Sequence, residues 1–187
     1  MRIIAGKHKG RHIEVARGAA HVRPTSGFAR EAIFNIISHG EYAEDPPYLG
    51  KSVADLCCGS GAFGLEALSR GAAHVTFVDT DHQSLQSARA NAERLGEDGH
   101  VSYVRADISQ LPPAPKPYGL IFLDPPYFSS LIAPALKSLR AGGWVDVDSL
   151  IVIEHDQGEQ AALPPGFAET DTRRYGRAVI RLARVVS

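Results

Sequence analysis

The chain has little cysteine, and this scarcity excludes two classes of site. Its 187 residues include only Cys57 and Cys58, which are neighbours. Adjacent cysteines rarely form a structural disulfide, and they lack the Cys-x-x-Cys spacing of a zinc or redox site. We therefore expect two small buried hydrophobic residues at a strand end, and no metal.

Long hydrophobic runs are also absent. No apolar stretch approaches the ~18 residues that suggest a membrane span, and the first residues, "MRIIAGKHKGRH", lack the apolar region of a signal peptide. With 44% hydrophobic and 22% charged residues, the composition is typical of an ordinary globular domain. We expect a cytoplasmic monomer with no membrane partner.

Acidic residues are nearly missing from the first 30 residues. This segment has seven basic side chains and one acid, Glu14, for a net charge of +6. The other 157 residues have 13 basic and 20 acidic side chains, for a net charge of −7. The asymmetry indicates contact with nucleic acid, or equally a solvated basic arm. Because "RIIAG" and "RHIEV" flank "KHKG", we expect residues 1–25 to form a basic N-terminal β-hairpin extension.

From Ser52 onward, apolar strands alternate with helical segments. A helix capped by Thr25 or Ser26 and ended by Gly40 precedes them. This alternation predicts a parallel sheet with helices on both faces, so residues 26–187 are expected to form one Rossmann-like α/β domain. The predicted strands are 52–58, 74–79, 100–107, 118–124 and 149–156, with helices at 63–72, 82–96 and 129–143 and a closing strand pair at 167–176 and 177–185.

A glycine-rich turn follows the first of these strands. In "DLCCGSGAFG", Gly59, Gly61 and Gly64 have the G-x-G-x-x-G spacing, and Asp79 lies 20 residues after Gly59. This pattern matches the dinucleotide fingerprint, in which glycines admit the ligand and the carboxylate binds ribose hydroxyls. It also fits a tight strand-to-helix turn without a ligand.

Two further acids favour S-adenosylmethionine over a nicotinamide. Asp55 lies just before the glycine turn, where it suits a cationic amino acid better than a pyrophosphate. Asp107 follows the third strand and could accept a hydrogen bond from an adenine amine. Ligands of open α/β sheets bind at the carboxyl ends of the strands, where all these residues are expected.

The stretch "IFLDPPYF" ends the fourth strand with an acid and two prolines. Proline fixes the backbone and removes a donor, so Asp124 and the Pro125 carbonyl offer two acceptors for one –NH₂ group, while Pro126 keeps a competing N–H away. Tyr127 can stack on a base. Direct methyl transfer to an exocyclic amine needs this orientation and no metal. A rigid turn is the alternative, and it suffices for the copy Asp45-Pro46-Pro47-Tyr48, which follows no strand.

Together these motifs resemble the RsmD-type methyltransferases. The resemblance is carried by "RIIAGKHKGR", "RPTS…REAIFNII", "DLCCGSGAFGLEALSRGA", "FVDTD" and "FLDPPY". It implies a class I S-adenosylmethionine-dependent fold with a mostly parallel seven-stranded sheet. It also implies methylation of the exocyclic N2 amine of guanine 966 in 16S ribosomal RNA, within a small-subunit particle.

The resemblance also implies roles for individual residues. The catalytic motif falls on Asp124, Pro125, Pro126 and Tyr127. The RNA-binding arm includes Arg2, Lys7, Lys9, Arg11 and Arg23. The cofactor contacts fall on Asp55, Cys57, Gly59, Gly61, Asp79, Thr80, Asp107, Ile108 and Asp124.

This sequence departs from the family pattern at Gly27-Phe28-Ala29, where an acid and a base are usual. Three other functions are alternatives to this one. An amino-methyltransferase acting on adenine or cytosine of DNA would use the same chemistry, but the chain shows no separate target-recognition domain. A non-catalytic RNA-binding protein would not need the intact motifs, and an NAD-dependent oxidoreductase has no use for Asp-Pro-Pro-Tyr.

Overall fold

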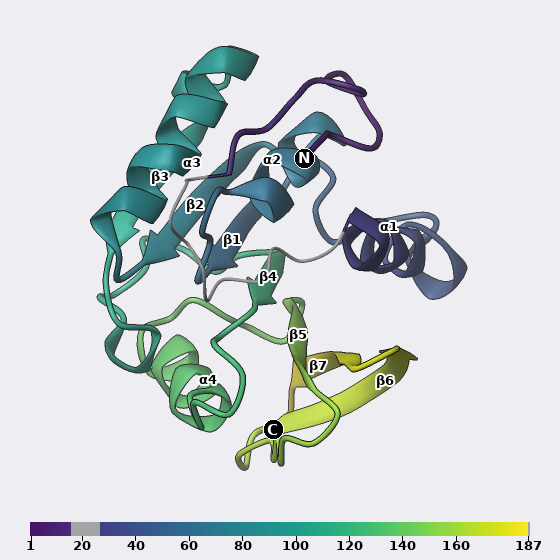
Figure 1. The fold of residues 1–187 in the computed structure, drawn as a ribbon. Helices are drawn as coiled ribbons and strands as arrows, with labels where there is room; N and C mark the ends of the chain where they lie inside the picture. Colours follow the sequence, from purple (N-terminus) through teal and green to yellow (C-terminus); the bar gives the residue numbers. More distant parts are fainter. Residues whose placement is uncertain (16–26, 187) are drawn as a thin grey trace.

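A single seven-stranded sheet organises the protein. The computed structural model describes residues 1–15 and 27–186, and its strands lie in the order β3-β2-β1-β4-β5-β7-β6 (Figure 1). The five strands from β3 to β5 are parallel, while β7 is antiparallel to both β5 and β6. The predicted mostly parallel α/β sheet is confirmed. The strands are β1 Ser52–Leu56, β2 His74–Asp79, β3 Val101–Arg105, β4 Leu120–Leu123, β5 Leu150–Asp156, β6 Phe167–Tyr175 and β7 Ala178–Val185.

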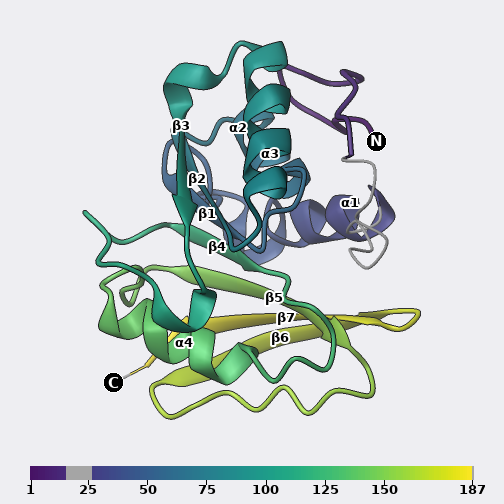
Figure 2. The same cartoon turned by 60° about the vertical axis from the view of Figure 1, so that its left-hand side comes forward.

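Helices cover both faces of this sheet (Figures 1 and 2). The first three pack with the N-terminal arm on one face, and α4 packs on the other. An aromatic stack fills the first face, since Phe63 lies between Phe34 and Phe122 with ring centroids 4.9 and 3.9 Å away. The helices are α1 Gly27–Ile36, α2 Ala62–Ser69, α3 His82–Leu95 and α4 Ile132–Ala141, with short 3₁₀ turns η1 Gly40–Tyr42, η2 Asp98–His100 and η3 Ile108–Gln110.

Several predicted boundaries are wrong by a few residues. Helix α1 ends at Ile36 rather than at Gly40, which begins a 3₁₀ turn instead. Strand β1 ends at Leu56, before the two cysteines, because Cys57 has a left-handed backbone with φ 59°. The prediction for helix α3 is confirmed at its end, where Gly96 adopts φ 74°. The predicted Thr25 or Ser26 cap lies outside the described residues.

The N-terminal arm turns back on itself and joins the core. Arg2 and His12 form one antiparallel bridge, not the two regular strands that the sequence predicts. Ile3 and Ile13 are 2% and 0% exposed and pack beneath the arm with α1 and α2. These two isoleucines thus join the arm to the main hydrophobic core. No helix in the described part of the chain is both long enough and apolar enough to span a membrane.

Candidate active site

Four aspartates gather around one thiol at the carboxyl edge of the sheet. Burial raises the pKa of the Cys57 thiol, and the negative charges of Asp79, Asp124, Asp55 and Asp107 raise it further, so all four carboxylates lie near this residue. They follow the ends of four parallel strands that are neighbours in the sheet. Asp79, Asp124 and Asp107 give this edge of the sheet a negative field that suits a cationic ligand.

Asp55 is the most deeply buried of the four. It is 1% exposed, and its Oδ2 accepts a hydrogen bond from the Gly64 amide at 2.9 Å. Burial raises the pKa of this carboxyl to about 8. Asp55 therefore lies beneath the glycine turn and fixes the start of α2.

The glycine turn is held by the acid at the end of β2. Gly59, with φ 52°, donates its amide to Asp79 Oδ2 at 3.0 Å, and Asp79 Oδ1 accepts the Asp81 amide. Gly61 adopts φ 76° as the N-cap of α2. A Cβ at Gly64 would lie 2.5 Å from the Phe77 ring, so this third glycine allows α2 to pack on β2.

Three of the predicted cofactor contacts, among them Asp107 for the adenine, lie after β2 and β3. Asp107 is exposed and caps η3, where its Oδ1 accepts the amide and hydroxyl of Ser109, contacts that lower its pKa. Thr80 is exposed, and its carbonyl accepts the Arg105 Nε–H. Ile108 is 3% exposed, so its backbone rather than its side chain is available to a ligand.

The Asp-Pro-Pro-Tyr motif begins directly after β4. The Asp124 amide donates to the Leu56 carbonyl at 3.4 Å, which fixes the motif beside β1. The Pro126 carbonyl accepts the Ser129 amide. Among the described residues, no backbone N–H lies within bonding distance of the Pro125 carbonyl, so that oxygen can accept from a ligand.

Tyr127 is positioned by a residue that sequence reasoning missed. Its hydroxyl donates to Glu154 Oε1 at 3.3 Å, and burial together with Glu154 and Asp124 raises its pKa. Glu154 is 4% exposed near the carboxyl end of β5. The signal was present in "LIVIEHD", where acids end a buried strand as Asp124 does, but no motif singles them out.

The predicted RNA-binding residues are distributed along the arm. Arg2 and Lys9 are exposed. Lys7 Nζ pairs with the buried Glu97 carboxylate at 2.6 Å, and Arg11 donates to the Arg94 carbonyl at 2.6 Å. Arg23 lies outside the described residues. The arm therefore offers solvent-facing cations, although Lys7 and Arg11 also fasten it to the domain.

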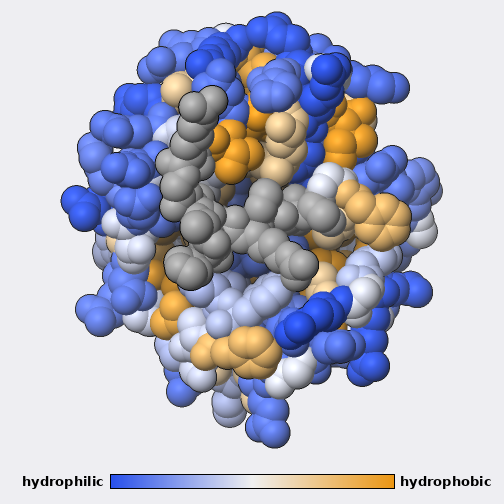
Figure 3. Space-filling model, viewed as in Figure 1, coloured by the Kyte–Doolittle hydropathy of each residue, from blue (hydrophilic) through white to orange (hydrophobic). Residues whose placement is uncertain are grey.

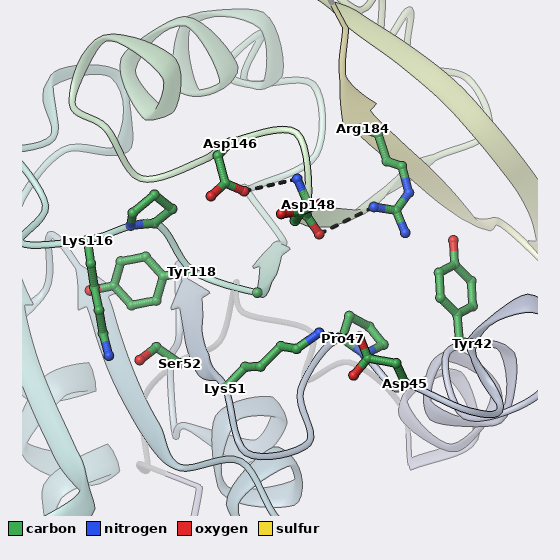
Figure 4. A pocket seen from close by; sticks show the side chains of 12 residues that line it. Tyr42, Asp45, Pro47, Lys51, Ser52, Lys116, Tyr118, Asp146, Asp148 and Arg184 are labelled. Carbon is green, nitrogen blue, oxygen red and sulfur yellow. Dashed lines mark hydrogen bonds and ion pairs between the residues drawn. The ribbon is translucent and has the colours of Figure 1, made fainter.

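A separate hollow of about 600 Å³ opens at the opposite, amino edge of the strands (Figure 4). Lys51 pairs there with Asp45 at 2.8 Å, and Arg184 donates to the Asp148 carbonyl at 3.3 Å. Because the glycine turn lies at the carboxyl edge, this hollow is not the pocket that the glycine turn lines. In the described ranges, 1–15 and 27–186, no three His, Cys, Asp or Glu side chains are grouped so as to hold a metal ion.

Comparison with known proteins decides the family. Residues 1–184 match the family described as "Conserved hypothetical protein 95", and Ribosomal RNA small subunit methyltransferase D of Escherichia coli strain K12 is 32% identical over 83% of this chain and 75% of that protein. The chain belongs to the RsmD-type methyltransferase family. YlbH of Bacillus subtilis strain 168 is 35% identical over 84% of this chain and 83% of its own length.

Solved structures agree with this assignment. The Escherichia coli protein yhhF has a TM-score of 0.81 to this RsmD-type chain, with 28% identity over 99% of this chain and 97% of that one. The fold is that of the class I methyltransferases, and the cofactor is S-adenosylmethionine. The residues at the carboxyl edge fit such a group, since the negative field around Cys57 suits a sulfonium and an ammonium.

Proposed function

We propose that the protein methylates the exocyclic N2 amine of guanine 966 in 16S ribosomal RNA, within a small-subunit particle. The observation that carries this proposal is the position of Asp124 to Tyr127 beside the glycine turn, with Asp124 and Asp79 both close to Cys57. The name of the Escherichia coli relative supports ribosomal RNA as the substrate. The protein acts as a cytoplasmic monomer in this proposal.

The site residues have distinct tasks in the reaction. S-adenosylmethionine supplies the methyl group on a positively charged sulfur. The Asp124 carboxylate and the Pro125 carbonyl accept the two N–H bonds of the guanine amine, which aims the nitrogen lone pair at the methyl carbon. Orientation of this kind can supply a large share of a rate enhancement. The Asp124 charge also stabilises the amine as it becomes positive.

The remaining residues bind the cofactor and position the target base. Asp79 accepts from ribose hydroxyls, and Asp107 lies where the adenine is expected. Gly59 and Gly61 let the backbone approach the ligand, beside Asp55, Cys57, Thr80 and Ile108. Tyr127 stacks on the guanine while Glu154 holds its hydroxyl. The target must be unpaired or flipped, because a paired amine is hidden.

The arm supplies the electrostatic part of RNA binding in this proposal. Residues 1–25 form the basic extension, and residues 26–187 form the methyltransferase domain. Exposed Arg2 and Lys9 contact phosphates, with Lys7, Arg11 and Arg23 adding to the positive potential.

The test is methyl transfer from labelled S-adenosylmethionine to small ribosomal subunits that lack the modification. Nucleoside mass spectrometry should find N2-methylguanosine, and fragment mapping should place it at guanine 966. An Asp124→Ala enzyme serves as the inactive control. Methylated adenine in DNA, with no methylated guanine in the subunit, would instead establish the alternative substrate.

A further inference from the structure

The tip of the β6–β7 hairpin is rich in arginine. Residues 172–181 include Arg173, Arg174, Arg177 and Arg181 and no acid. Arg173 and Arg177 are 58% and 66% exposed, although each Nε also pairs with one aspartate, Asp171 or Asp156, at 2.9 Å. Both guanidinium groups are therefore accessible to an anion.

An exposed aromatic residue lies beside this tip. Phe28 is 67% exposed in the first turn of α1, and its ring meets that of Tyr175 edge to face, with centroids 5.7 Å apart and planes at 79°. In this arrangement neither ring covers both faces of the other. The exposed Phe28 ring therefore keeps a face on which a flat group can stack, while Tyr175 is partly buried against the core and supports it.

Strand register places these side chains on one face of the hairpin. Arg173 is directly opposite Ile180, and Tyr175 is opposite Ala178, so both point to the face where Ile180 packs with α1. Arg174, between them in the strand, points to the opposite face because side chains alternate. We call Phe28, Arg173, Tyr175 and Arg177 the tip surface.

The tip surface is linked to the catalytic motif through two buried acids of β5. Arg177 pairs with Asp156, which lies two residues after Glu154 on the same face of β5, and Glu154 accepts the Tyr127 hydroxyl. Tyr127 also lies near enough to Arg177 to contribute to the raised pKa of Arg177, after the larger effect of Asp156.

The same surface reaches toward the arm on its other side. Arg30, two residues after Phe28, donates to the Arg2 carbonyl at 2.7 Å, so α1 lies between the arm and the hairpin. Figure 1 shows this arrangement, and in the same view hydrophobic and strongly hydrophilic residues meet where α1 approaches β6 (Figure 3).

We propose that the tip surface binds an unpaired nucleotide of the RNA substrate next to the target base. This inference rests on the proposed function. The exposed Phe28 ring beside guanidinium groups fits a base and its phosphate, which is how proteins hold single-stranded nucleic acid. Phe28 belongs to Gly27-Phe28-Ala29, the segment at which this sequence departs from the family pattern.

The experiment measures RNA affinity separately from turnover. Full-length variants are titrated into a short, fluorescently labelled unpaired RNA and into small ribosomal subunits. Phe28→Ala should weaken binding to the RNA about tenfold. Phe28→Tyr keeps an aromatic ring and should bind the RNA about as tightly as the wild type. Arg173→Gln should weaken binding severalfold and flatten its salt dependence. The matched control, Arg174→Gln, removes the same charge from the opposite face of β6 and should change affinity less than about twofold.

Three results would overturn the tip surface. The first is that Phe28→Ala and Arg173→Gln both bind the RNA as tightly as the wild type. The second is that the wild type does not bind this RNA. The third is that Phe28→Ala weakens binding to the subunit but not to the short RNA, which would indicate a contact with a protein of the subunit. If Phe28→Ala weakens RNA binding but the wild type methylates no guanine, the tip surface stands and the proposed reaction fails. Calorimetry with S-adenosylmethionine, unchanged in every variant, verifies folding.

Discussion

Asp55 shows how burial changes the chemistry of one carboxyl group. Its folded pKa is about 8, whereas an unfolded aspartate has a pKa of about 3.9. Between these values the folded protein binds a proton that the unfolded chain does not. The contribution of Asp55 to the free energy of unfolding therefore falls as pH rises from about 4 to about 8, by at most about 1.4 kcal/mol per pH unit, and is constant above.

Asp55→Asn should remove this dependence. The amide stays neutral and can still accept the Gly64 hydrogen bond, so the variant should gain stability relative to the wild type as pH rises from about 5 to about 8. Urea unfolding of both proteins without cofactor at several pH values gives the difference, in which other titrating groups cancel. Parallel stability curves would show that Asp55 ionises normally in the folded protein.

Asp124 is predicted to act on the amine and not on cofactor affinity. Asp124→Ala should lower kcat for methyl transfer about 100-fold or more, because it removes a positioned negative acceptor. The dissociation constant for S-adenosylmethionine, measured by calorimetry, should stay within about twofold. Asp45→Ala is the matched control, since it alters the same residue of the second Asp-Pro-Pro-Tyr and should leave turnover unchanged. Near-normal turnover of Asp124→Ala would remove the acceptor role.

Helix α2 holds the N-terminal arm through one fully buried carboxylate. Glu66 is 0% exposed and accepts the Ile4 and Ala5 amides at 2.8 and 3.0 Å, together with the Arg70 Nε–H at 2.7 Å. The buried Arg30 of α1 lies 3.7 Å from the same carboxylate. A single side chain therefore joins the arm, α1 and α2.

Glu66→Gln should loosen the arm. The amide cannot satisfy all these donors, so we expect a loss of about 1–3 kcal/mol in the free energy of unfolding. Hydrogen exchange of residues 3–13 should quicken more than that of the central strands. Glu93→Gln, an exposed change on α3, is the control and should alter stability by less than about 0.5 kcal/mol. Equal stabilities of the two variants would contradict this account of the arm.

The uneven charge of the whole molecule predicts how binding responds to salt. Each phosphate contact that is lost should reduce the magnitude of the negative slope of log K against log salt by about 0.7–0.9. Lys9→Gln should produce such a change, while Lys7→Gln should produce a smaller one because Lys7 pairs with Glu97. Changing Lys7, Lys9 and Arg11 together should flatten the slope most. Lys116→Gln, at the amino edge of the sheet, is the control, and an unchanged slope in the triple variant would exclude the arm from the RNA interface.

Local patterns in the chain predict most of the architecture. The alternation of apolar strands and helices from Ser52 onward predicts the parallel sheet, because burial on both faces leaves a signal within a few residues. The positions of Asp55, Asp79, Asp107 and Asp124 after strands likewise predict that they meet at one edge. Element boundaries are not fixed by these patterns, as at Cys57, because a left-handed residue leaves no mark in hydrophobic periodicity.

Contacts between segments far apart in the sequence became visible only in the tertiary structure. Glu66 looks like an ordinary helix residue, and only packing shows that it binds the arm 62 positions away. Glu154 joins the site because β5 lies next to β4, and Phe28 meets Tyr175 because β7 brings β6 back toward α1. The sequence by itself determined the fold class and the methyl-transfer motif, since both depend on local order. Burial, pKa and the shape of the RNA surface were decided by the tertiary structure, because they depend on which distant side chains exclude water from one another.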